Sequence, residues 1–150
     1  MKLAPINTNI NKKLPKTLLY KLPKTDRFLM FTTTKPKIVG NMNIFPFSVK
    51  GCKAMYISSI ETSPRRQGYG EDLVNFAKIY SRQQGYGGNL STDAKLTFKD
   101  MKNPSHIFFR KQGFTCDDKS FLRRMDSHIE QNKQLDPLTV KTVNMYYLEK

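Results

Sequence analysis

The sequence has few cysteines and no long hydrophobic run, and each shortage excludes a class of protein. Its two cysteines, Cys52 and Cys116, lie far apart and belong to no Cys-x-x-Cys or Cys/His cluster. This excludes a disulfide scaffold and a zinc site, and it is typical of a reducing cytosol. No apolar run approaches the ~18 residues of a membrane span, and residues 1–20 contain no apolar signal-peptide core. We therefore expect a cytoplasmic protein with no membrane partner and no metal.

Acidic residues are also scarce, since 12 of them stand against 26 lysines and arginines, for a formal charge of +14. Most of the excess lies in residues 1–53, which hold eleven basic residues and one acidic residue, Asp26. Such a segment attracts polyanions, so nucleic acid is one candidate partner of the basic N-terminal third. A solvated, lysine-rich arm without a partner explains the same charge equally well.

The length of 150 residues, of which 38% are hydrophobic, supports one packed domain with a loose terminal arm. Residues 1–27 are basic and are broken by Pro15 and Pro23. We therefore expect an irregular arm over residues 1–27 and a folded domain over residues 28–150. From residue 28 the pattern predicts strands over residues 28–34, 38–49 and 54–60, and their short connections favour an antiparallel meander. Gly40 and Pro46 are expected to make the second strand irregular.

The clearest helix follows these strands, because Leu73, Phe76, Ala77 and Tyr80 form one apolar stripe at helical spacing. Gly85 supplies its C-terminal stop. The rest of the chain is expected to continue the alternation of strands and helices and so to complete a mixed α/β domain. Its expected elements are a strand over 89–94, a helix starting at Asn103–Pro104, a strand opening at Phe114, a charged helix over 120–134 and a last strand over 139–148.

The segment SPRRQGYG, residues 63–70, joins the third predicted strand to this helix. Its glycines permit a sharp turn that points several backbone N–H groups at one place, where the positive end of the helix also attracts anions. Arg65 and Arg66 add positive charge. The segment matches neither the Walker loop nor the dinucleotide fingerprint. Taken alone, it is better explained by an ordinary glycine turn with exposed arginines.

Together with its neighbours, this segment resembles the pyrophosphate-binding motif of the GNAT superfamily of acyl-CoA N-acyltransferases. The family pattern Q/R-x-x-G-x-G/A is matched by Arg65, Gly68 and Gly70, and Leu73 falls where the family usually has leucine. Downstream, NPSHIFFRKQGF resembles the second family signature, an asparagine followed by an aromatic-rich helix that ends in Gly-Phe. The resemblance covers about residues 28–118, and residues 139–148 match its last strand.

The resemblance implies an α+β, GNAT-like fold, with a mixed, mainly antiparallel sheet flanked by helices. It implies acetyl-CoA as the acyl donor, an amine as the acceptor, and no metal. The residues that match the family's cofactor contacts come from the strand end, the loop and the second signature. They are Ile60, Thr62, Arg65, Arg66, Gln67, Gly68, Tyr69, Gly70, Asn103 and Phe109.

N-acylation requires a neutral amine, and a general base supplies it. Glu61, at the end of the strand before the loop, is the candidate base, and Asp93 is the second choice. An exposed strand-end carboxylate without a chemical role explains Glu61 equally well. His106, in the first turn of its helix, is expected at the surface, and Cys116 is expected to be a buried, inert thiol.

The chain departs from the family in three places, one of which is the segment 120–134, which looks like an insertion before the last strand. The family usually has a long helical region before its second strand, which helps to shape the acceptor site, and residues 1–27 are too short and too proline-rich to supply it. Many members also protonate the departing thiolate with a tyrosine, and Phe109 at that position has no hydroxyl group. The preferred function is therefore an N-acetyltransferase. The alternatives are a non-catalytic basic protein that binds nucleic acid, and a GNAT-fold CoA binder without transfer activity.

Overall fold

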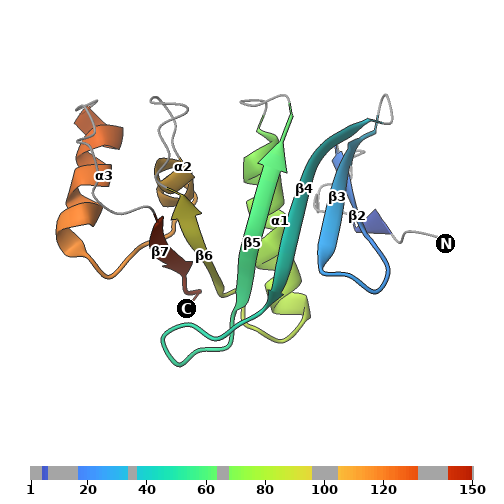
Figure 1. The fold of residues 1–150 in the computed structure, drawn as a ribbon, viewed down its shortest axis with the longest axis horizontal. Coiled ribbons are helices and arrows are strands. Elements are labelled where there is room, and N and C mark those ends of the chain that lie inside the picture. The colour runs from blue at the N-terminus through green and yellow to red at the C-terminus, as the bar shows by residue number, and fades with distance from the viewer. Residues whose placement is uncertain are drawn as a thin grey trace. The chain divides into compact units, whose positions relative to one another are not determined.

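The computed structural model describes residues 5–6, 17–33, 37–63, 68–95, 105–131 and 142–149. The chain divides into two compact units, Met1–Leu90 and Ser91–Lys150. Figure 1 shows the strands and helices of each unit along the chain.

In its described residues, the first unit is an antiparallel sheet of five strands with one helix. The strands pair in chain order, each with the next. This confirms the antiparallel meander predicted for residues 28–60. The elements are β1 (Pro5–Ile6), β2 (Thr17–Lys21), β3 (Arg27–Thr32), β4 (Ile38–Pro46), β5 (Met55–Thr62) and α1 (Tyr69–Gln83).

Strand β2 shows that the expectation of an irregular segment throughout residues 1–27 was wrong. It pairs with β3 along its whole length, from Thr17 opposite Thr32 to Lys21 opposite Phe28, and Leu19 is fully buried. The two prolines, at positions 15 and 23, lie outside the strand, so no ladder donor is lost within it. Strands β2 and β3 are joined by a tight turn in which the Leu22 N–H donates to the Arg27 carbonyl at 2.9 Å. The wider division into an arm and a domain over residues 28–150 stays a prediction.

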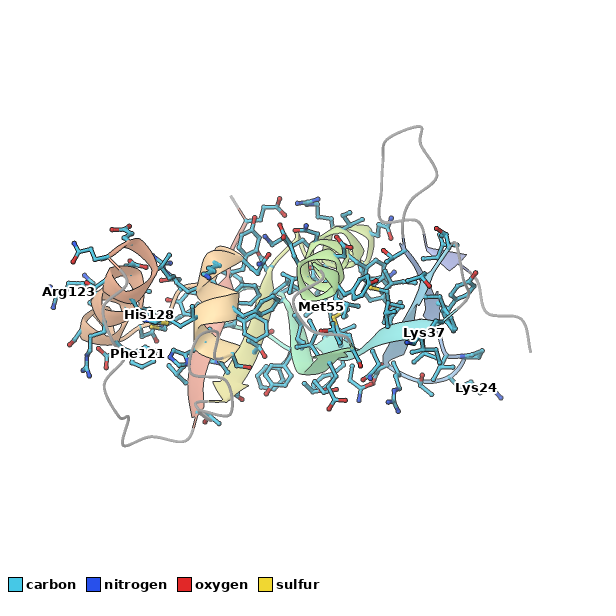
Figure 2. All side chains as sticks on the ribbon, turned by 90° about the horizontal axis from the view of Figure 1, so that it is seen from above. Lys24, Lys37, Met55, Phe121, Arg123 and His128 are labelled. Carbon is cyan, nitrogen blue, oxygen red and sulfur yellow. The ribbon has the colours of Figure 1, made fainter. Side chains whose placement is uncertain are left out.

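Helix α1 packs the predicted apolar stripe against one face of this sheet, as Figures 1 and 2 show. Leu73, Phe76 and Ala77 are fully buried. The Phe28 ring lies 4.9 Å from that of Phe76 and 5.0 Å from that of Tyr80. The helix ends as predicted, because Gly85 adopts a φ of 86° directly after it. The sheet contributes to this core the buried side chains of Leu19, Phe28, Met30, Met42, Ile44 and Ile57.

A register shift in the β4–β5 pair decides which side chains at the end of β5 face the helix. Asn43 pairs with Ser59, whereas the next residue, Ile44, pairs with Ile57, so Ser58 is the extra residue of a bulge. Beyond the bulge, Ile60 pairs with the buried Met42 on the helix side. Glu61 pairs with Asn41 and points to the opposite face.

Gly40 brings α1 close to the end of β5. A Cβ atom at this position would lie 3.1 Å from Leu73 Cδ1 and 3.2 Å from the Glu61 carbonyl oxygen. The second strand is irregular here, as predicted, because its register with β3 shifts between Met30 and Phe31. A side chain at position 40 would therefore require Leu73 or the end of β5 to shift by a few tenths of an ångström.

The second unit consists of β6 (Leu90–Lys95), which starts at the boundary, α2 (Ser105–Lys111), α3 (Lys119–Gln131) and β7 (Thr142–Tyr147). Asp118 begins α3 by accepting a hydrogen bond from the Phe121 N–H at 3.0 Å. Arg110 of α2 binds both carboxylate oxygens of Asp126 of α3, at 2.7 and 3.0 Å. The expected strand at Phe114 was wrong, because the segment forms only an isolated bridge between Thr115 and Tyr146.

We predict that Gly40→Ala lowers the free energy of unfolding by about 1–3 kcal/mol, the usual penalty for overpacking. The loss of unfolded-state entropy works in the opposite direction but contributes only about 0.4–1 kcal/mol. Urea denaturation measures the change. Leu73→Ala removes one of the two clashing atoms, so the double variant should lose less stability than the sum of the single variants. Equal or higher stability in Gly40→Ala would contradict the close approach.

Candidate functional site

The strand end and the helix start that were predicted to hold the cofactor both lie in the first unit, at the two ends of one connection. Ile60, Glu61 and Thr62 are the last residues of β5, and α1 begins at Tyr69 and Gly70 directly after Gly68. The remaining loop and second-signature residues proposed from the sequence lie outside the described residues. These are Arg65, Arg66, Gln67 and Asn103.

Gly68 is the N-cap residue of α1 and leaves the helix start without a side-chain cap. Its φ of 82° lies in the left-handed region, which favours glycine. A Cβ atom built there would meet no described atom within 4 Å. The first N–H groups of a helix have no partner within the helix and lie at its positive end. This arrangement fits a phosphate group.

Two carboxylates in the first turn of α1, Glu71 and Asp72, offset part of that positive potential. Glu71 is exposed and Asp72 is half-buried. The binding of a phosphate at this position would therefore depend more on hydrogen bonds from the backbone N–H groups than on the net charge around the helix start. Such hydrogen bonds act at short range and from fixed directions.

Glu61 lies on the face of the sheet opposite α1, because it follows Ile60, whose side chain faces the helix. Its side chain is exposed, and it stands across the β4–β5 pair from Asn41. Among the described residues its carboxylate makes no ion pair or hydrogen bond. A carboxylate in this position is accessible to an amine that approaches from solvent.

The candidate residues of the second unit have structural contacts of their own. Phe109 is 2% exposed, and its ring lies 5.1 Å from that of Phe114 and 5.2 Å from that of Phe108. It is a core residue, and its contact with a cofactor stays a prediction. Asp93, the second-choice base, is exposed and accepts a hydrogen bond from the Asn144 side-chain amide at 3.2 Å.

Solved structures resemble this arrangement although their sequences differ strongly. The chain superposes on a mosquito arylalkylamine N-acetyltransferase with a TM-score of 0.54 at 17% identity, covering 83% of this chain and 74% of that one. It matches Ard1 from Thermoplasma volcanium with a TM-score of 0.53 at 12% identity over 83% and 72% of the two chains. Arabidopsis thaliana Naa50, in complex with the bisubstrate analogue CoA-Ac-MVNAL, matches with a TM-score of 0.50 at 17% identity over 82% and 72%. The chain has the GNAT fold.

The likeness is one of fold alone, because no protein-family model and no curated protein matches the sequence. The GNAT fold confirms the predicted α+β class with its mainly antiparallel sheet and flanking helices. No helix among the described residues is long and apolar enough to cross a membrane. Within the same ranges, no group of three or more His, Cys, Asp or Glu residues is arranged to hold a metal.

One side chain of this GNAT-fold chain corrects the sequence-based expectation. His106 is fully buried rather than at the surface, and neither of its ring nitrogens has a hydrogen-bond partner among the described residues. Its ring lies 5.5 Å from that of Phe121 on α3. Burial, and secondarily the nearby His128, lowers the pKa of His106 to about 4. The expectation for Cys116 was correct in its burial, which raises the pKa of that thiol.

The spacing of residues in α2 was a sequence signal for the burial of His106, although histidine in the first turn of a helix is usually exposed. His106 lies three residues before Phe109 and next to Ile107, in a helix whose other buried residues are those two. Figure 2 shows Phe121 and His128 on the side of α3 nearer α2, and Arg123 on the far side. His106 therefore belongs to the packed α2–α3 interface.

We predict that acid destabilises the protein through His106. The folded pKa is about 4 against 6.5 for the free side chain, so the unfolded chain binds more protons between these values. The contribution of neutral His106 to the free energy of unfolding is therefore fully present above pH ~6.5. It is lost as the pH falls towards ~4, and the loss amounts to up to about 3 kcal/mol. Chemical denaturation at a series of pH values measures the slope. In His106→Leu this part of the slope should disappear, and an unchanged slope would contradict the prediction.

Proposed function

We propose that the chain is an acyltransferase that moves an acetyl group from acetyl-CoA to an amine. The observation that carries the proposal is the uncapped start of α1 at Gly68, in a GNAT fold, with Glu61 at the end of the strand that leads to it. The bisubstrate analogue bound to the neighbour Naa50 contains CoA, and this supports acetyl-CoA as the donor.

In this proposal the backbone N–H groups from Arg66 to Gly70 bind the pyrophosphate of the donor, and Arg65 adds positive charge. Ile60 and Thr62 contact the pantetheine arm along β5. Asn103 and Phe109 contribute from the second signature. Holding the thioester and the amine together supplies much of the rate, since effective molarities reach ~10⁵ M or more.

Glu61 is proposed to take a proton from the ammonium form of the acceptor. The neutral nitrogen then attacks the thioester carbonyl carbon, so that a C–N bond forms and the C–S bond breaks. The sulfur leaves as a thiolate, and the second proton lost by the nitrogen reaches it through solvent. Because the ordinary pKa of a thiol is ~8.5, departure near neutral pH does not require a tyrosine at position 109.

The two alternatives give different results in simple measurements. A GNAT-fold CoA binder without transfer activity would bind acetyl-CoA and release no thiol with any amine. A basic protein that binds nucleic acid through residues 1–53 would not bind acetyl-CoA. The two cysteines are free thiols, and this supports the further proposal that the protein is cytoplasmic.

We predict that Gly68→Val weakens acetyl-CoA binding at least tenfold, because a side chain at the N-cap would compete with the phosphate for the space beside the first N–H groups of the helix. Isothermal titration calorimetry measures the affinity. Gly85→Val is the matched control, since Gly85 also has a positive φ, 86°, and also has nothing within 4 Å of its Cβ position. Both variants place valine at a similar positive φ, 82° and 86°, so equal affinities in the two variants would contradict phosphate binding at Gly68.

We predict that Glu61→Gln lowers turnover by about 10²-fold or more while acetyl-CoA affinity changes little, since a general base contributes about 10²–10⁴-fold. Thiol release in the presence of an amine library measures turnover. The acidic limb of the pH profile should also disappear. Asp93→Asn is the comparison, and wild-type turnover in Glu61→Gln with a loss in Asp93→Asn would transfer the role to Asp93.

A further inference from the structure

The sheet of the first unit has a face that no described helix of that unit covers. Helix α1, the one helix described in this unit, packs on the side that contains Phe28, Met42 and Ile57. Strand alternation and the observed register place the other side chains on the opposite side. This open face consists of Leu18, Tyr20, Arg27, Leu29, Phe31, Asn41, Asn43, Phe45, Tyr56, Ser59 and Glu61.

The centre of the open face is polar, and its side chains have no hydrogen-bond or ion-pair partner among the described residues. Asn41 pairs with Glu61 in one row, and Asn43 lies between Arg27 and Ser59 in the next. None of these side chains makes a hydrogen bond within the described ranges. Two amides, a guanidinium and a carboxylate on one sheet surface thus remain available to a ligand.

Aromatic side chains follow this polar centre at the hairpin end of β4 and β5. The Phe45 and Tyr56 rings lie 5.3 Å apart, and the Phe47 ring lies 5.7 Å from that of Tyr56. Phe47 is 60% exposed, the largest exposure among the large hydrophobic residues of the described chain. Exposed aromatic clusters of this kind are typical of recognition surfaces.

We propose that the open face binds an extended, acidic polypeptide that carries the acceptor amine. The proposal rests on the proposed acetyltransferase function and names its substrate class. A small amine would contact one row of side chains, whereas these rows continue along the strands. The eleven basic residues among residues 1–53 attract an acidic partner and oppose a second copy of this chain. Glu61 opposes a nucleic-acid backbone at the same place.

The row spacing predicts the acceptor sequence. Same-face residues of a strand lie about 6.6 Å apart, so the Asn41, Asn43 and Phe45 rows span about 13 Å, the length of four extended peptide steps. With its amine at Glu61, a peptide would place its third side chain at Arg27 and its fifth at Phe45 and Tyr56. We therefore expect an acidic third residue and an apolar fifth residue.

The test uses the full chain, acetyl-CoA and short peptides with a free N-terminal amine. The reference peptide has Asp at position three and Phe at position five. One variant peptide has Lys at position three, and another has Ser at position five, with the other positions unchanged. A polyamine and an arylalkylamine represent small acceptors. Thiol release should give a kcat/KM about tenfold higher for the Asp-third peptide than for the Lys-third peptide. Faster transfer to either small amine than to any peptide would overturn the proposal.

Charge reversal provides the sharper test. Arg27→Glu should invert the preference between the Asp-third and Lys-third peptides, without changing acetyl-CoA affinity. Lys24→Glu is the matched control, because it makes the same charge change at an exposed position in the β2–β3 turn, outside the rows (Figure 2). Phe47→Ser should raise KM several-fold for the Phe-fifth peptide and leave the Ser-fifth peptide unaffected. Equal effects of Lys24→Glu and Arg27→Glu would overturn the docking geometry.

Fluorescence anisotropy with the labelled Asp-third peptide separates the two proposals. If this peptide binds, and Arg27→Glu weakens it, while no thiol is released with any amine, the docking surface stands and the transferase proposal fails. If thiol release occurs with small amines while no peptide binds, the transferase proposal stands and the docking surface is wrong.

Discussion

The close contact between α1 and the β4–β5 pair at Gly40 is the constraint on which the candidate site depends. Leu73, which a Cβ at position 40 would meet at 3.1 Å, lies one helical turn after the start of α1. The Glu61 carbonyl, on the other side of the same contact, belongs to the end of β5. One small residue therefore holds both ends of the connection between β5 and α1. The proposed phosphate site requires backbone N–H groups whose direction is maintained, and this packing fixes the start of α1, from which those groups would point.

The second unit is stabilised by different interactions. Its bidentate Arg110–Asp126 pair joins α2 to α3, and the hydrogen bond from Arg110 lowers the pKa of Asp126. The two side chains remain 25% and 36% exposed, so the pair contributes at most about 1 kcal/mol. The buried apolar side chains of this unit, among them Phe114, Met125 and Met145, remove much larger apolar areas from water. Within that apolar packing His106 has no hydrogen-bond partner among the described residues, and its burial lowers its pKa to about 4.

Apart from the strand expected at Phe114, the sequence predicted the order of elements from β3 to β7, because each strand and helix carries its own period and end signals. The stripe of α1 and the Gly85 stop are local features, and both predictions were confirmed. Strand β2 was missed because prolines close to it suggested irregularity, while its burial depends on pairing with β3. The bulge at Ser58, which directs Glu61 away from the helix, depends on cross-strand register that no single segment encodes. For the same reason the burial of His106 depends on α3, which follows it in the chain.

The tight turn between β2 and β3 has a consequence for how the proposed docking surface can change. Lys24, Thr25 and Asp26 are exposed, and the turn is closed by local hydrogen bonds, including one from the Thr25 hydroxyl to the Leu22 carbonyl at 2.7 Å. Lengthening an exposed connection costs little, since each doubling of loop length adds only about 0.6 kcal/mol. An inserted segment at this turn would lie at the margin of the sheet without altering any strand pairing. Insertions there would therefore change what lies beside the proposed docking surface while the sheet keeps the same scaffold.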